Sequence, residues 1–192
     1  MQEKNVYQIE WEEKKETGQR TRDFDTVEEM NDAIVKGIND NVAENDILYC
    51  LGDWSFGGIQ NIWEFRKRIN CKNIHLILGN HDHHIENNRL INISEEQLQE
   101  YGECVTMSDY SKYIIDSSTA KEIEINGHWY FQVPIRTLFS SVNHMLVKEI
   151  GGVKMTLCHY SFRTWDKAHH GTWMLYGHSH GTLEEYGAQR WS

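Results

Sequence analysis

The sequence is poor in the features that mark linkers, secreted proteins and membrane segments. It contains one proline, Pro134, and has no proline-rich linker, internal repeat or low-complexity segment. Its N-terminal residues form no apolar leader, and every apolar run is much shorter than a membrane span. At 192 residues the chain can build one domain with a substantial core, but hardly two. We therefore expect a single domain over residues 1–192, soluble and cytoplasmic, with no membrane partner.

Cysteine pairs and basic residues are also scarce. The four cysteines include no Cys-x-x-Cys pair, which favours buried, reduced thiols over disulfides or zinc ligands. The 19 Lys and Arg stand against 29 Asp and Glu, a formal net charge of −10. This balance argues against a broad contact surface for nucleic acid or anionic lipid. Aromatic residues are plentiful by contrast, with 7 Trp, 9 Tyr and 6 Phe available for an apolar core.

The N-terminal part of the chain changes from charged to helical in character near residue 26. Residues 1–24 are rich in charge and predict a solvated arm or loop. Thr26 and Glu29 have the spacing of a capping box, which indicates the start of a helix. Apolar residues then recur at helical spacing as far as Val42, so this helix has one apolar face.

Two short apolar runs, at 47–51 and 74–78, predict buried strands on either side of a helix at 59–69. A strand, a helix and a strand within some thirty residues form a βαβ unit with parallel strands. The other expected elements are a short helix at 94–99, hairpins at 121–133 and 145–157, and a last strand at 172–176. The predicted fold class is therefore α/β, with a βαβ unit first and antiparallel hairpins later.

Four polar clusters follow predicted strands. They are Gly52-Asp53, Gly79-Asn80-His81-Asp82, Cys158-His159-Tyr160 and Tyr176-Gly177-His178-Ser179-His180-Gly181. In open α/β sheets, ligands bind at the carboxyl ends of the strands, so these clusters are expected to meet at one site. Asp, Asn and His supply the oxygen and nitrogen donors that hold a pair of divalent metals.

Each cluster also has a plain structural explanation when it is taken alone. Gly52-Asp53 is an ordinary turn, Asn80 and Asp82 are common turn residues, and His159 could be a half-buried histidine. Two histidines between glycines, as in Gly177–Gly181, are more distinctive, because the glycines allow a tight backbone that aims both rings at one place. The order and placement of all four together carry the prediction of a metal site.

In this order the clusters resemble the motifs of the calcineurin-like metallophosphoesterases, in particular the small phage and bacterial members, over about residues 26–183. The segments 51–57 and 159–165 look like local signatures of those small members. The resemblance implies a two-sheet α/β/β/α sandwich with outer helices. It also implies hydrolysis of a phosphomonoester or phosphodiester at a dinuclear metal site.

The resemblance assigns metal-binding roles to five residues. It makes Asp53 the carboxylate that bridges two metals, with Asn80, His159 and His178 completing one site and His180 belonging to the other. Mn, Fe, Zn or Ni would suit this mixture of nitrogen and oxygen ligands.

Three further residues receive catalytic roles. The resemblance implies that His81 protonates the leaving oxygen and that Asp82 orients His81. Arg163 is a candidate for stabilising the charge that develops on the phosphoryl group, although a surface arginine explains it equally well.

The family's first motif, Asp-x-His, has no counterpart, because residues 1–25 contain no histidine. We therefore expect that the first strand is missing, that metal binding is weak and mononuclear, and that activity is poor. His169-His170 could substitute for the absent ligand, although surface histidines explain this pair better. The alternatives are a truncated, inactive metal-binding remnant and a nuclease acting on nucleic-acid ends. A small phosphate ester is the favoured substrate, and the oligomeric state is left open.

Overall fold

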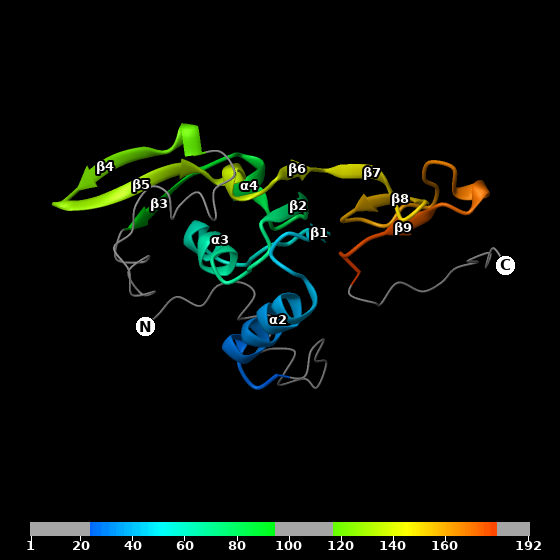
Figure 1. Ribbon diagram of the computed structural model, residues 1–192, viewed down its shortest axis with the longest axis horizontal. Helices are drawn as coiled ribbons and strands as arrows, with labels where there is room; N and C mark the ends of the chain where they lie inside the picture. The colour runs from blue at the N-terminus through cyan, green and yellow to red at the C-terminus, as the bar shows by residue number, and fades with distance from the viewer. Residues whose placement is uncertain (1–23, 95–116, 180–192) are drawn as a thin grey trace.

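A computed structural model describes residues 24–94 and 117–179 of the chain (Figure 1). The helices are α2 (Val27–Asn41), α3 (Ile59–Arg66) and α4 (His83–Glu86), with 3-10 turns η1 (Ser117–Thr119), η2 (Ile135–Leu138) and η3 (Ala168–His170). The strands are β1 (Ile47–Cys50), β2 (Asn73–Ile77), β3 (Leu90–Ser94), β4 (Lys121–Ile125), β5 (His128–Pro134), β6 (Ser141–Asn143), β7 (Met145–Ile150), β8 (Val153–Cys158) and β9 (Trp173–Leu175). His180, most of the predicted arm at 1–24 and most of the predicted helix at 94–99 lie outside the described residues; Ser94 itself ends β3.

The central sheet has the strand order β1-β2-β6, and all its pairs are parallel. Ile47 lies opposite Asn73 and Cys50 opposite Leu76, with α3 in the connection between β1 and β2. The predicted βαβ unit is therefore confirmed. Strand β6, three residues long, adds a third parallel strand that the sequence pattern did not indicate.

Two further three-stranded sheets lie on either side of the central one (Figure 1). The first has the order β3-β5-β4, with antiparallel pairs, and contains the predicted hairpin at 121–133. The second has the order β7-β8-β9 and contains the predicted hairpin at 145–157, while β9 pairs in parallel with β8. Helices with three small sheets confirm a mixed α/β fold. The two-sheet sandwich stays a prediction.

The apolar core joins the two long helices to the central sheet and to the β3-β5-β4 sheet. Trp63 of α3, Ile74 of β2 and Ile93 of β3 are fully buried in one cluster, and Val35 of α2 belongs to it. Figure 1 shows α2 and α3 on the same side of the sheets. Leu157 and Cys158 of β8 are buried outside this cluster. Among the described residues, the β7-β8-β9 sheet therefore depends less on the main core.

The two long helices begin and end for identifiable reasons. The Thr26 side chain accepts a hydrogen bond from the Glu29 N–H at 3.1 Å, and Glu29 accepts one from the Thr26 N–H at 3.3 Å, so the predicted capping box is confirmed. Helix α3 ends at Arg66, earlier than the predicted residue 69. The buried Arg66 guanidinium donates to the carbonyls of Ile69 and Leu138, both at 3.0 Å, and so stabilises a turn in place of further helix.

No helix in residues 24–94 or 117–179 combines the length and apolar character that crossing a membrane requires.

Candidate metal centre

The loops that follow β1 and β2 touch each other at two glycines. Gly52 and Asp53 both have left-handed backbones, with φ of 98° and 55°. A Cβ added to Gly52 would lie 2.8 Å from the Gly79 nitrogen, and one added to Gly79 would lie 2.6 Å from the Asp53 nitrogen. Real Cβ atoms do not approach other atoms so closely, so both positions require glycine for this contact to form. The glycines thus bring Asp53 and Asn80 to the same sheet edge.

The buried Asp82 carboxylate links these two loops through hydrogen bonds. Asp82 is 2% exposed. Its Oδ2 accepts hydrogen bonds from the N–H groups of Asp53 and Gly79, each at 2.8 Å, and its Oδ1 accepts one from Trp54 at 2.9 Å. Burial raises the pKa of Asp82, and these three backbone N–H groups oppose that rise. The predicted contact with the His81 ring is not among the three bonds, and the orienting role of Asp82 stays a prediction.

His159 is buried at the end of β8 with one ring nitrogen fixed. Its Nδ1 lies 2.7 Å from the Leu51 carbonyl oxygen, and the residue is only 2% exposed. A carbonyl can only accept, so Nδ1 must carry the proton of this hydrogen bond. The other ring nitrogen, Nε2, then faces the remaining predicted ligands. Holding one imidazole nitrogen with a backbone carbonyl, so that the other can bind a metal, is common in metal sites.

Three other predicted ligands converge on this Nε2. It lies 3.0 Å from Asn80 Oδ1, 3.1 Å from His178 Nδ1 and 3.4 Å from Asp53 Oδ2. Donors that share one metal at bonds of about 2.0–2.2 Å lie about 2.8–3.6 Å apart. The structure therefore places the three other residues assigned to this metal site within 3.0–3.4 Å of one atom, His159 Nε2.

The oxygens that face His159 Nε2 need either a proton or a metal ion on that nitrogen. With Nδ1 protonated, His159 Nε2 and the two oxygens of Asn80 and Asp53 all present lone pairs to one another. Lone pairs that face each other in a buried site repel, unless a proton on Nε2 or a metal ion lies between them. A mixed set of nitrogen and oxygen donors is the kind that divalent transition metals accept. The donor types therefore suit a metal, although the described Asp and His side chains form no metal-holding group without Asn80.

The acidic and histidine side chains do not make this centre alone. Within residues 24–94 and 117–179, no group of three or more His, Cys, Asp and Glu side chains could hold a metal ion. Asn80 is of a different residue type, and His180 lies outside the described residues. A metal held here would therefore require the Asn80 amide in addition to Asp53, His159 and His178.

His178 reaches the centre through the backbone that follows β9. The N–H groups of Gly177 and His178 both donate to the His159 carbonyl at 3.0 Å, which ties this loop to the end of β8. The exposed ring of Tyr160 packs against both imidazoles, with centroid distances of 5.0 Å to His159 and 4.8 Å to His178. The β7-β8-β9 sheet thus supplies the two predicted histidine ligands, and the central sheet supplies the predicted ligands Asp53 and Asn80.

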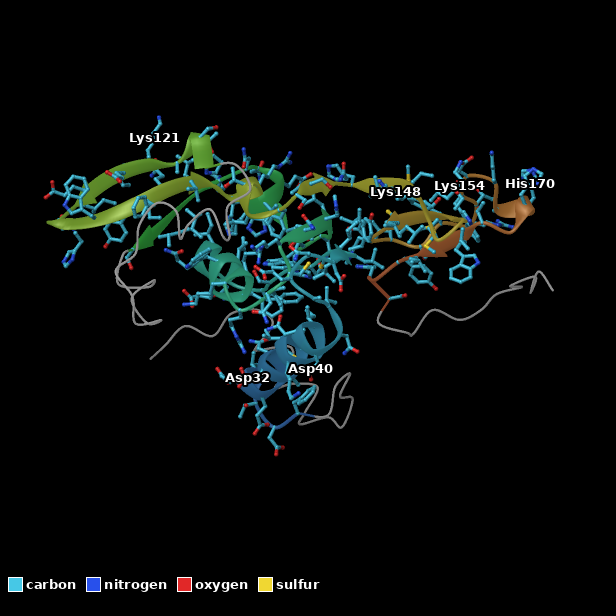
Figure 2. The ribbon with its side chains drawn as sticks, viewed as in Figure 1. Asp32, Asp40, Lys121, Lys148, Lys154 and His170 are labelled. Atoms are coloured by element: carbon cyan, nitrogen blue, oxygen red, sulfur yellow. The ribbon has the colours of Figure 1, made fainter. Side chains whose placement is uncertain are left out.

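The remaining predicted residues lie around this centre or away from it. The exposed His81 donates its backbone N–H to Asp53 Oδ1 at 3.0 Å, and its ring lies 4.7 Å from that of Phe56. Arg163 is exposed on the loop after β8, and its catalytic role stays a prediction. The rings of His169 and His170 contact each other at a tilt in η3, and Figure 2 shows His170 at the outer end of the β7-β8-β9 sheet. This pair is not brought to the four ligands.

Two supporting contacts were not foreseen from the sequence. The Leu51 carbonyl holds His159, and the backbone N–H of Trp54 holds Asp82. Backbone groups carry no sequence signal of their own, although glycines at 52 and 79 are compatible with such close contacts. No family model, curated protein or solved structure matches this chain. The candidate centre therefore rests on its own residues and geometry.

Proposed function

We propose that this protein is a metal-dependent phosphoesterase of the calcineurin-like kind, which hydrolyses a phosphomonoester or phosphodiester. The observation that carries the proposal is the convergence of Asp53, Asn80 and His178 on Nε2 of His159. The hydrogen bond between His159 Nδ1 and the Leu51 carbonyl adds support, because it leaves Nε2 available to bind a metal. The resemblance of the four motifs to that family supplies the reaction class.

The four side chains would hold a divalent metal, and Mn, Fe, Zn and Ni all accept such ligands. A divalent metal supplies charge stabilisation to the oxygens of a phosphoryl group. The protein residues would then fix the position of the ester and exclude alternative geometries. Arg163 is the proposed additional cation, since it lies four residues after His159 on the same loop.

His81 is the proposed proton donor to the leaving oxygen. Its backbone is tied to Asp53, while its ring is exposed and lies outside the contacts that converge on His159. An imidazole beside a reacting phosphate, but not bound to the metal, is suited to general acid catalysis. Asp53 thus fixes the backbone of the proton donor as well as serving as a ligand.

The contacts of Asp53 favour one metal at this centre over two. Its Oδ2 faces His159, while its Oδ1 accepts the N–H of His81 at 3.0 Å. A bridging role would need Oδ1 to exchange that hydrogen bond for a second metal. Metal binding without turnover is therefore the second candidate function, and it predicts one bound metal and no hydrolysis.

Elemental analysis combined with a hydrolysis assay tests the proposal on one sample. The protein is loaded with Mn²⁺, its metal content is measured, and bis(4-nitrophenyl) phosphate and 4-nitrophenyl phosphate are offered as substrates. Bound Mn²⁺ with turnover, both lost in Asp53→Asn, is the expected result. Bound Mn²⁺ without turnover of either ester would establish the second candidate, and no bound metal would refute both.

His81→Asn separates proton donation from metal binding. Turnover should fall about 10²–10⁴-fold, because the general acid is lost. Metal content should stay unchanged, because the side chain is not a ligand and the backbone N–H that donates to Asp53 is retained. His83→Asn, at the exposed start of α4, is the matched control and should keep both. Equal loss of metal and turnover in His81→Asn would make His81 a ligand.

A further inference from the structure

The junction between the β1 and β2 loops is held by one buried carboxylate. Asp82 accepts hydrogen bonds from three backbone N–H groups, those of Asp53, Trp54 and Gly79. We infer that Asp82 is a positioning residue, which holds Asp53 and Asn80 at the separation and backbone conformation that metal binding needs. This inference rests on the proposed function, because it concerns the same centre.

Asp53 needs such support because its backbone is strained. A φ of 55° places it in the left-handed region, which residues other than glycine seldom adopt, although Asp and Asn do so more often than most. Strained conformations persist where the surrounding structure holds them in place. The two oxygens of Asp82 bind the successive N–H groups of Asp53 and Trp54, at 2.8 and 2.9 Å. One carboxylate therefore fixes the peptide on each side of the strained residue.

The same carboxylate also fixes the neighbouring loop. The Oδ2 atom that binds Asp53 accepts the Gly79 N–H at 2.8 Å, and Gly79 directly precedes the proposed ligand Asn80. The backbones that carry two of the four proposed ligands thus share one acceptor oxygen. One acceptor oxygen therefore holds both loops at a fixed separation.

This role differs from the one that the family resemblance implies for Asp82, which is to orient His81. The three bonds all lead to backbone groups around Asp53, whereas His81 meets the centre through its own backbone N–H. If Asp82 acts on metal ligands, its loss should weaken metal binding. If it acts on His81, its loss should slow turnover and leave metal binding intact.

Asp82→Asn is the test, in the wild-type chain and in His81→Asn. One acceptor oxygen becomes an amide NH₂, which cannot accept from a facing N–H. We expect the affinity for Mn²⁺, measured by titration calorimetry, to fall about 10–100-fold, the range seen when groups that support metal ligands are removed. The fall should be equal in both backgrounds. An unchanged affinity, or a fall that vanishes in the His81→Asn background, would overturn the inference.

A destabilised control shows whether lower stability alone weakens metal binding. Val35→Ala removes core volume on α2, outside the contacts of the candidate centre, and should lower stability without changing the affinity for Mn²⁺. Asp166→Asn removes an exposed carboxylate that pairs with Lys154, and it should change neither quantity appreciably. A loss of affinity in Val35→Ala equal to that in Asp82→Asn would assign the effect to stability.

Amide exchange in the wild-type protein gives a readout that needs neither metal nor a folded variant. The N–H groups of Asp53, Trp54 and Gly79 should exchange slowly, because each donates to the buried carboxylate. Exchange at the rate of free loops would overturn the inference even if metal binds. If these amides are protected but the protein binds no Mn²⁺, the proposed function is refuted. The three hydrogen bonds to Asp82 would still be established.

Discussion

At the scale of single residues, Gly79 sets how closely the loops that carry Asp53 and Asn80 approach each other. A Cβ there would lie 2.6 Å from the Asp53 nitrogen and would also collide with the Asp53 carboxylate. Gly79→Ala should therefore lower the free energy of unfolding by about 1–3 kcal/mol, the usual effect of overpacking, and weaken Mn²⁺ binding. Urea denaturation and calorimetry measure the two quantities.

Gly37 provides a control of opposite sign. It lies in the middle of α2, and a Cβ there would meet nothing within 4 Å. Gly37→Ala should raise stability by about 0.5–1 kcal/mol, because alanine favours the helix, and should leave Mn²⁺ affinity unchanged. If both substitutions had the same effect, the close contact of Gly79 with Asp53 would not exist in solution.

At the scale of elements, the capping box of α2 is the contact that the sequence predicted most directly. Thr26→Ala removes the acceptor for the Glu29 N–H and should cost about 1 kcal/mol of stability. Thr26→Ser keeps the hydroxyl, and serine is at least as good an N-cap, so stability should stay nearly unchanged and the pair isolates the hydrogen bond. Thermal or urea unfolding measures both variants, and an equal loss in the two would assign the effect to the methyl group.

The central sheet carries a titratable contact across its three strands. Tyr49 of β1, His75 of β2 and Ser141 of β6 are register partners. The His75 ring stacks on Tyr49 with a centroid distance of 5.1 Å, and its Nδ1 lies 2.8 Å from Ser141 Oγ. Burial, and then the charge of Lys148 on β7, lower the pKa of His75 below 6.5 (Figure 2). The folded protein thus favours the neutral ring.

This lowered pKa predicts acid sensitivity of the fold. In the unfolded chain His75 binds its proton near pH 6.5, whereas the folded chain binds it only at lower pH. The stability from the neutral ring is therefore complete above pH 6.5 and is lost as the pH falls through the lower pKa of the folded state. In urea titrations, His75→Gln should lose less stability than wild type over that range. Identical pH profiles for the two proteins would contradict the prediction.

Elements with strong local signals were predictable, and elements defined by distant pairing were not. The apolar runs of β1 and β2 are visible in the sequence. So is the turn signal Asn126-Gly127, which indicates the hairpin at 121–133. Strand β6 has only three residues, and its place is fixed by pairing with β2. The end of α3 depends on Arg66 reaching the Leu138 carbonyl, 72 residues away. Such contacts exist only once the chain has folded.

At the scale of the whole molecule, the candidate centre joins a sheet that packs in the main apolar core to a sheet whose buried residues lie outside that core. The motif order predicted that Asp53, Asn80, His159 and His178 would meet, and the structure brings them together. The clamp by Asp82 could not be predicted, because its partners are backbone groups of another loop. The centre thus links the central sheet, which is part of the main core, to the β7-β8-β9 sheet, whose buried residues Leu157 and Cys158 lie outside it.

This arrangement predicts that metal stabilises one part of the molecule selectively. Without metal, amides of β8 and β9 should exchange faster than those of β2, because fewer core contacts hold them. Added Mn²⁺ should slow exchange in β8 and β9, since His159 and His178 would become tied to Asp53 and Asn80. The β4-β5 hairpin, which lies on the other side of the central sheet, should not respond (Figure 1).

Hydrogen-exchange mass spectrometry on wild type and Asp53→Asn tests this prediction. The substitution removes the carboxylate that faces His159 Nε2 and should abolish the effect of Mn²⁺ on β8 and β9. Slowing of the β4-β5 hairpin to the same extent would mean that the ion acts on the surface charge of −10 and not at the centre. Slowing confined to β8, β9 and the ends of β1 and β2 would locate the ion between the two sheets, because the four proposed ligands come together there.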